Sequence, residues 1–365
     1  MKLNYYMPTE VFFGKDAIKN NYEVLKGYGA KALIVTGARS SKMNGSLKDV
    51  LNALDNLDAN YMIFDKVEEN PSLETIEAGA KLGKEFNCDY VIGIGGGSPI
   101  DASKAIAVMI KNPNITRDTI ITTDKLEALD VVAVPTTSGT GTETTQYSIV
   151  TDHDNKTKLN LGQCIFPKIA FCDPTYTMRM EYDTTLNTAI DALSHLIEGY
   201  LNINANLLTD TLVEKGIKLW GECINNLSAD KLGYEEREKL MMASTLGGIV
   251  IAQTGTSIPH GMGYALTYFK GLPHGIANGV LYKEYLRTFK NQSRVNDIVE
   301  FIGLNNINEL EELLNNLINI TVMITEEEIT EFTDGMWNNK GKLKNHPEEI
   351  SYEELYNIYK NTFIL

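Results

Sequence analysis

The first half of the chain alternates short apolar runs with longer amphipathic segments. Two of these segments, 73–86 and 99–110, repeat apolar residues at helical spacing. The apolar runs have the length and the β-branched content of buried strands, and they lie at 32–36, 61–65, 90–94, 131–134 and 169–172. This alternation predicts a parallel sheet with helices on its faces. The early segment Val11–Phe13 is interpreted as part of a small additional hairpin.

The pattern changes after Asp173-Pro174, where long Leu- and Ile-rich segments with helical periodicity replace the strands. The helices expected there are 184–202, 206–226, 234–253, 309–317, 326–338 and 352–361. The fold class predicted is therefore α/β followed by all-α. The boundary between the two parts is expected near residues 175–182.

A glycine-rich loop joins a predicted strand to a predicted helix. Gly95, Gly96 and Gly97 let the backbone turn sharply and approach a ligand without Cβ obstruction. Ser98 is the expected N-cap of the helix, and Asp101 can complete a capping box. Exposed N–H groups at such a helix start bind anions, so the loop predicts a pyrophosphate site. A tight turn without a ligand is the alternative, because the loop departs from the GxGxxG fingerprint at Ser98.

A second loop, rich in hydroxyl groups and glycine, follows the next predicted strand at 135–143 (PTTSGTGTE). Ligands of open α/β sheets gather beyond the carboxyl ends of the strands. One such loop could be an ordinary surface loop, whereas two after neighbouring strands favour a bound nucleotide. We therefore predict a Rossmann-like dinucleotide-binding domain at 1–178, followed by a helical domain at 179–365.

The helical half contains an acidic residue and three histidines with the spacing of a metal site. Asp191 and His195 are four residues apart, which places both on one face of a helix. His260 and His274 each occur as Pro-His-Gly, and the segment 271–273 should end one helix before another begins. One carboxylate with three imidazoles suits Fe²⁺, Zn²⁺, Co²⁺ or Ni²⁺. A core or capping role is the alternative for any one of these histidines.

Composition and charge narrow the classes of function. The formal net charge of −15 argues against nucleic acid as a partner, because a phosphate backbone is bound through clustered Lys and Arg. No apolar run approaches a membrane span, and the N-terminus does not read as a signal peptide. The four cysteines lack metal-site or disulfide spacing, which indicates reduced thiols and a cytoplasmic location. His153 and His346 are expected in loops.

The ordered motifs resemble those of the iron-activated, or group III, alcohol dehydrogenases. They are Asn70-Pro71, GGGSPID at 95–101, PTTSGTGTE at 135–143, the DPT turn at 173–175, DALSHLIEGY at 191–200, HGMG at 260–263, PHGIANG at 273–279 and Asn345-His346-Pro347. The resemblance covers nearly the whole chain. It implies a dinucleotide-binding domain followed by a helical metal-binding domain, the architecture shared with dehydroquinate synthase. It also implies a dimer or a larger homo-oligomer.

The resemblance also assigns site residues. The family's metal ligands fall on Asp191, His195, His260 and His274, with Fe²⁺ as the expected ion and Zn²⁺ as the alternative. Its cofactor-binding positions, together with the first glycine of the loop, are Asn70, Gly95, Gly96, Gly97, Ser98, Asp101, Thr136, Thr137 and Lys158.

Two departures from the family pattern concern the cofactor and the proton. Many NAD-preferring relatives carry an Asp after the first long strand, where this chain has Gly37. Gly37 leaves room for a 2′-phosphate, and Arg39, Ser40, Ser41 or Lys42 could bind it, which favours NADP(H) over NAD(H).

The second departure is Tyr264, at a position where many relatives have a histidine credited with relaying the proton. A phenol relay, proton transfer directly through water, and an ordinary aromatic lining are all open.

These features predict a metal-dependent, NAD(P)-linked alcohol dehydrogenase that interconverts small alcohols and aldehydes by hydride transfer. The metal would polarise the alcohol or carbonyl oxygen. Glycerol or diol dehydrogenation, or a dehydroquinate synthase-like reaction, is the alternative on the same architecture. A metal- or nucleotide-binding protein without catalysis is the alternative of another class.

Overall fold

The computed structural model describes residues 3–154 and 157–363, which form two compact units. The α/β unit contains residues 6–180 together with 233–241. The helical unit contains, among the described residues, 3–5, 181–232 and 242–363. No helix among these residues is both long and apolar enough to span a bilayer.

The α/β unit contains a sheet of six parallel strands in the order β1-β8-β5-β4-β2-β3. The strands are β1 (Glu10–Phe13), β2 (Lys31–Thr36), β3 (Asn60–Phe64), β4 (Tyr90–Gly95), β5 (Asp130–Pro135) and β8 (Ile169–Cys172). The chain runs from β2 outward to β3 and then returns to the other side of β2 as β4. The carboxyl ends of β2 and β4 therefore flank the point where the strand order reverses, which is the place where such sheets bind ligands.

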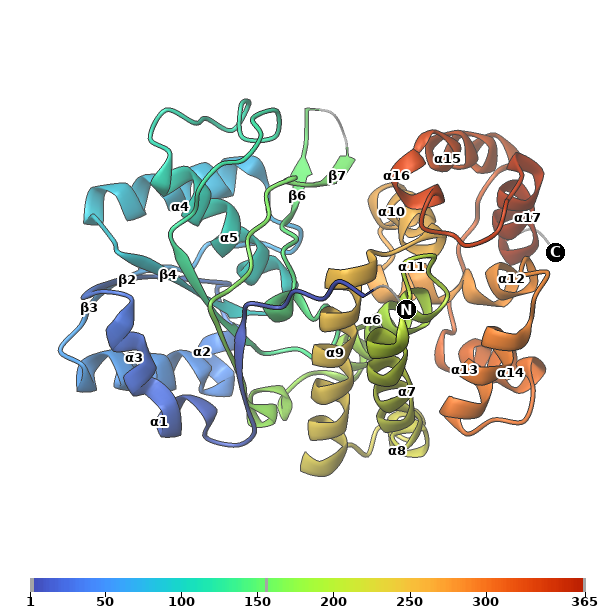
Figure 1. The fold of residues 1–365 in the computed structure, drawn as a ribbon, viewed down its shortest axis with the longest axis horizontal. Coiled ribbons are helices and arrows are strands. Elements are labelled where there is room, and N and C mark those ends of the chain that lie inside the picture. The colour runs from blue at the N-terminus through green and yellow to red at the C-terminus, as the bar shows by residue number, and fades with distance from the viewer. Residues whose placement is uncertain (1–2, 155–156, 364–365) are drawn as a thin grey trace. The chain divides into compact units, whose positions relative to one another are not determined.

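Both faces of this sheet are covered, which explains its continuous apolar strands. Leu33 and Val35 of β2 pack on one side against α4 and α5, whereas Ala32 and Ile34 face α1 and α3. Figure 1 shows α4 and α5 on one face of the sheet and α1 to α3 on the other. The helices are α1 (Ala17–Asn21), α2 (Ser40–Asn44), α3 (Ser46–Asn56), α4 (Leu73–Phe86) and α5 (Gly97–Lys111).

The helical unit is built around α6 (Tyr182–Tyr200), which is buried at nearly every position from Thr185 onward and packs against α7 and α11. The helices after α6 are α7 (Leu207–Gly221), α8 (Ile224–Ser228), α9 (Tyr234–Thr254), α10 (Ile258–Lys270), α11 (His274–Gly279), α12 (Tyr282–Arg287), α13 (Ser293–Ile302), α14 (Ile307–Leu317), α15 (Glu326–Asn338), α16 (Lys340–Leu343) and α17 (Tyr352–Phe363). The first residues of α9 belong to the α/β unit.

One expectation about local structure was wrong, one was incomplete, and one pair of strands was not expected. Val11–Phe13 does not form a hairpin, because β1 pairs in parallel with β8, a strand far along the chain. The helix expected at 206–226 ends at Gly221, where an added Cβ would lie 2.4 Å from the carbonyl oxygen of Ile302. The sequence pattern also missed a two-stranded antiparallel pair, β6 (Ile149–Asp152) and β7 (Thr157–Asn160).

Candidate metal centre and cofactor loops

One face of α6 carries three buried polar side chains in an otherwise apolar setting. Asp191, His195 and Glu198 occur at helical spacing and therefore point in similar directions. All three are at most 5% exposed. Burying such groups is costly unless each finds a partner, so their alignment indicates a polar site inside the helical unit.

The histidines of α10 and α11 lie against this face. Gly271, in the left-handed conformation with φ 67°, ends α10 and allows the chain to turn before His274 begins α11. Gly275 permits the close approach of α11 to α6, because a Cβ there would lie 2.0 Å from the carbonyl oxygen of Asn187. Backbone geometry thus brings His274 beside Asp191.

The four expected ligands lie together, with three of them forming a tighter group. Asp191, His195 and His260 each offer an atom within 4.8 Å of the others, and the Nε2 atoms of His195 and His260 are 3.0 Å apart. His274 lies at the edge of the group, with its Nε2 3.8 Å from Oδ1 of Asp191. Its ring centre is 5.2 Å from that of His260.

The chemistry of this group fits a divalent cation. Oδ1 of Asp191 is buried and accepts no hydrogen bond from the described residues. No hydrogen bond therefore offsets the cost of removing this carboxylate oxygen from water. Burial, followed by repulsion from His195 and Lys342, lowers the pKa of His260 well below its usual value. The imidazole is therefore neutral at neutral pH, which is the form that binds metal.

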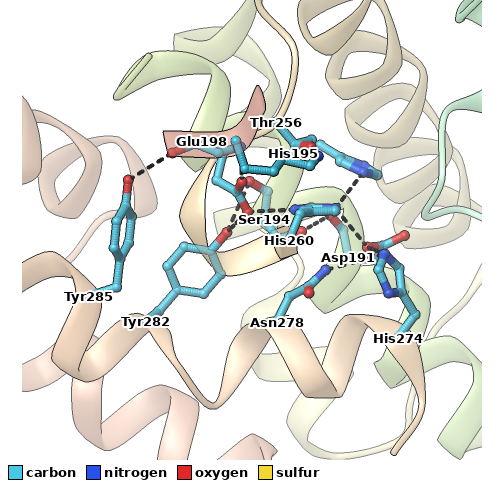
Figure 2. Close-up of polar contacts among 12 residues, drawn as sticks. Asp191, Ser194, His195, Glu198, Thr256, His260, His274, Asn278, Tyr282 and Tyr285 are labelled. Atoms are coloured by element: carbon cyan, nitrogen blue, oxygen red, sulfur yellow. Dashed lines mark hydrogen bonds and ion pairs between the residues drawn. The ribbon is translucent and has the colours of Figure 1, made fainter. Parts of the chain in front are cut away.

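Glu198 supports His260 from the side away from the other ligands (Figure 2). Its Oε1 lies 2.5 Å from Nδ1 of His260 and accepts a hydrogen bond from the hydroxyl of Tyr282 at 2.8 Å. Its Oε2 accepts from the backbone N–H of Ser257 at 2.6 Å. Burial raises the pKa of Glu198, and these donors oppose that shift. A proton on Nδ1 of His260 leaves its Nε2 available as a ligand.

Sequence analysis missed Glu198, although the signal was present. The residue lies three positions after His195 and seven after Asp191, on the same helical face.

Tyr264 lies beside the metal group. Its ring stacks on the ring of His274, with centres 5.9 Å apart and planes inclined by 23°. The ammonium nitrogen of Lys342 lies 5.7 Å from the centre of the same Tyr264 ring.

In the α/β unit, the expected cofactor residues gather around the glycine loop. Helix α5 starts at Gly97, two positions before the start expected from Pro99, and Gly96 is its N-cap. Ser98 is therefore inside the helix and is not the cap. No side chain caps the start of α5, so its first backbone N–H groups are available to an anion.

Hydrogen bonds join several of these residues into one network. Oγ of Ser98 accepts from the backbone N–H of Asn70 at 3.0 Å, and Oδ1 of Asn70 accepts from Nζ of Lys158 at 2.6 Å. The loop after β5 lies beside the glycines: Thr136 donates its N–H to the carbonyl of Gly95 at 2.8 Å. A Cβ on Gly96 would lie 3.2 Å from the side chain of Thr137, so the two loops are in close contact.

Asp101 belongs to a buried network that joins α5 to the second loop. Its Oδ1 accepts from the hydroxyl of Thr142 at 2.5 Å, and its Oδ2 accepts from the backbone N–H of Ile149 at 3.0 Å. The neighbouring Lys104 is fully buried and donates to the carbonyls of Thr142, Thr145 and Tyr147. Burial lowers the pKa of Lys104 to about 8. Both oxygens of Asp101 are thus engaged within the protein.

The residues after β2 differ in how they are used. Arg39 and Ser40 are exposed, and within the described part of the chain the side chain of Arg39 makes no hydrogen bond or ion pair. Ser41 is buried and accepts from the hydroxyl of Thr36 at 2.8 Å. Lys42 forms an ion pair of 2.6 Å with Asp65, which directly follows β3.

Comparison with known proteins places this geometry in a family. Residues 8–174 match the family described as iron-containing alcohol dehydrogenase, and residues 185–363 match its C-terminal family. An NADPH-dependent butanol dehydrogenase from Clostridium saccharobutylicum is 33% identical over 328 residues, covering 87% of this chain and 82% of that protein. NADH-dependent butanol dehydrogenase A from Clostridium acetobutylicum is 30% identical, covering 84% of this chain and 80% of that protein.

A solved structure has the same fold over its whole length. The crystal structure of an iron-containing alcohol dehydrogenase from Thermotoga maritima superposes with a TM-score of 0.92 at 37% identity, covering 99% of both chains. The two halves of the sequence and the complete fold therefore all match the same family. The chain belongs to the iron-containing alcohol dehydrogenase family.

Proposed function

We propose that this enzyme interconverts small alcohols and aldehydes by hydride transfer to and from a nicotinamide dinucleotide. The observation that carries the proposal is the buried group of Asp191, His195 and His260, with His274 at its edge. The butanol dehydrogenase activities named for two relatives support alcohols and aldehydes of this size.

These four residues would hold one divalent metal ion. When bound, such an ion supplies Lewis-acid polarisation of the substrate oxygen. The surrounding residues prepare the ligands, since Glu198 fixes the orientation of the His260 ring through Nδ1. The low exposure of Asp191 and His260 keeps bulk water away from the charged group, which strengthens every electrostatic interaction within it.

The glycine loop would hold the pyrophosphate of the dinucleotide. The uncapped start of α5 offers backbone N–H groups, and the positive end of the helix dipole favours an anion there. Asn70, Ser98 and Lys158 already form one hydrogen-bonded network next to that helix start. Lys158 adds a positive charge beside the proposed phosphate position.

Within this proposal, we favour NADP(H) over NAD(H). The residues after β2 include no carboxylate that would repel a 2′-phosphate, and Arg39 is exposed with its donors available. The nearest carboxylate after the neighbouring strand, Asp65, is paired with Lys42. The two relatives described above differ in cofactor, so the support comes from these residues of the chain itself.

An anaerobic assay tests the proposed reaction. Butanal reduction is followed with NADPH and NADH, with added Fe²⁺ and after chelation. We expect turnover that chelation abolishes and Fe²⁺ restores, with a higher kcat/KM for NADPH. Turnover that persists in verified metal-free protein would overturn the metal-dependent reaction, and a higher kcat/KM for NADH would overturn the cofactor preference alone.

A further inference from the structure

Lys342 places a positive charge beside the metal group. The residue belongs to the short helix α16, and its ammonium donates a hydrogen bond to the hydroxyl of Thr256. Its nitrogen also lies 5.7 Å from the ring centre of Tyr264. Within residues 3–154 and 157–363, it forms no ion pair with a carboxylate. An ammonium has three donor hydrogens, and the described residues engage one of them.

Contacts with Tyr264 and Gly261 place Lys342 close to the metal ligands. The ring of Tyr264 contacts both Lys342 and the ligand His274. The Cγ atom of Lys342 lies 3.2 Å from the position of a Cβ on Gly261, the residue after the ligand His260. Lys342 therefore lies next to the metal-ligand group, on the side where α10 carries Gly261 and Tyr264.

A purely structural role does not require this charge. The segment that carries Lys342 is already tied to the same turn, because Nδ2 of Asn345 donates to the carbonyl of Thr256 at 2.8 Å. A partly buried ammonium without a paired carboxylate is costly, and its burial lowers the pKa of Lys342 to about 8. A divalent cation would balance the carboxylates of Asp191 and Glu198. The charge of Lys342 would then remain available to an anion.

We propose that Lys342, with Tyr264 beside it, binds a negatively charged group of the substrate. The substrates selected by this subsite are short aldehydes that carry a carboxylate, and the corresponding hydroxy acids. This inference rests on the proposed function, since it names the substrate class of the same site. The carboxylate accepts hydrogen bonds from the free donors of the ammonium, while the aldehyde oxygen lies toward the metal ligands.

The test compares aldehydes of equal length with and without a carboxylate. Oxo acids of two, four and five carbons are each paired with the matching unbranched aldehyde, and the ratio of their kcat/KM values is measured. This ratio does not depend on the active fraction of a preparation. We expect the wild type to prefer at least one oxo acid, and Lys342→Met to lower that ratio about tenfold or more. Lys342→Arg, which retains the charge, should keep most of the preference.

Lys344→Met is the matched control, because Lys344 lies two residues away and is exposed. Its ratio should equal that of the wild type. A wild type that prefers the neutral aldehyde at every length, or an equal ratio in wild type and Lys342→Met, would overturn the proposal.

A binding measurement separates this proposal from the proposed function. Calorimetry of butanedioate with the metal-loaded protein should give an affinity that Lys342→Met weakens about tenfold or more and Lys344→Met leaves unchanged. Absence of turnover with every aldehyde would reject the proposed reaction, while this titration would still decide the subsite. Equal affinities in wild type and Lys342→Met would reject the subsite.

Discussion

Oε1 of the buried Glu198 lies 2.5 Å from Nδ1 of His260, so a carboxylate outside the expected ligand set holds one of the ligands in place. The carboxylate is itself held by the backbone of Ser257 and the hydroxyl of Tyr282. Such support fixes both the tautomer and the orientation of a metal-binding imidazole.

Glu198→Gln should therefore weaken metal binding without removing a ligand. An amide has one acceptor where the carboxylate has two, and it cannot bring a negative charge to the imidazole. We expect the metal dissociation constant to rise about 10- to 100-fold, measured by competition with a chelator of known affinity. Glu326→Gln, on the exposed start of α15, is the control and should bind like the wild type. Equal affinity in Glu198→Gln and the wild type would show that Glu198 does not support the site.

Gly275→Ala should disturb the approach of α11 to α6. The new Cβ would lie 2.0 Å from the carbonyl oxygen of Asn187, so α11 must move and take His274 with it. We expect a loss of about 1–3 kcal/mol in the free energy of unfolding, measured with denaturant, and weaker metal binding. Gly335→Ala in α15 is the control, because its Cβ meets no atom within 4 Å and should be neutral or stabilising. Similar behaviour of the two variants would count against the packing argument.

Arg39→Ala should change the cofactor preference if the exposed guanidinium binds a 2′-phosphate. We expect KM for NADPH to rise about tenfold or more, while KM for NADH changes little. Lys48→Ala, an exposed cation on α3, serves as the control and should alter neither constant. A parallel rise in both KM values would mean that Arg39 does not discriminate between the two cofactors.

His346 should make stability depend on pH in the acidic range. The residue is 4% exposed, its ring lies beside Tyr285 and Phe289, and burial lowers its pKa from 6.5 to about 4. The unfolded chain therefore takes up a proton at a higher pH than the folded protein does. Neutral His346 therefore contributes to the free energy of unfolding. This contribution is fully present above pH 6.5 and is lost as the pH falls toward 4.

The pH effect is measured as a difference between two proteins. In metal-free samples, the wild type should lose up to about 3 kcal/mol more than His346→Phe between the two pKa values. The difference isolates His346 from the other titrating groups. Parallel stability curves for the two proteins would refute the assignment.

The parts of the structure that sequence predicted well are those that depend on local pattern. The apolar runs predicted the strands β2 and β4, and the helical periodicity predicted α4. In each case the pattern of apolar residues within the segment itself is enough to indicate the element. Spacing also predicted that Asp191 and His195 share a face of α6. The assignment of these residues as metal ligands, the expected homo-oligomer and the cytoplasmic location stay predictions.

Features that depend on distant partners could not be predicted in this way. The short strand β1 gives no local sign that it pairs with β8. Lys342 and Gly261 are far apart in sequence, and no spacing rule places them together. The observed start of α5 differs from the expected one. Gly97 is the first helical residue, whereas N-cap propensity favoured Ser98 as the cap. Tertiary contacts decided each of these cases.

The metal content per chain tests the central claim most directly. Wild type, His260→Ala and the exposed control His153→Ala are loaded anaerobically with Fe²⁺, freed of loosely bound ion and measured by mass spectrometry. The structure predicts about one ion per chain in the wild type and in His153→Ala, and almost none in His260→Ala. An equal metal content in all three proteins would contradict the metal centre formed by Asp191, His195, His260 and His274.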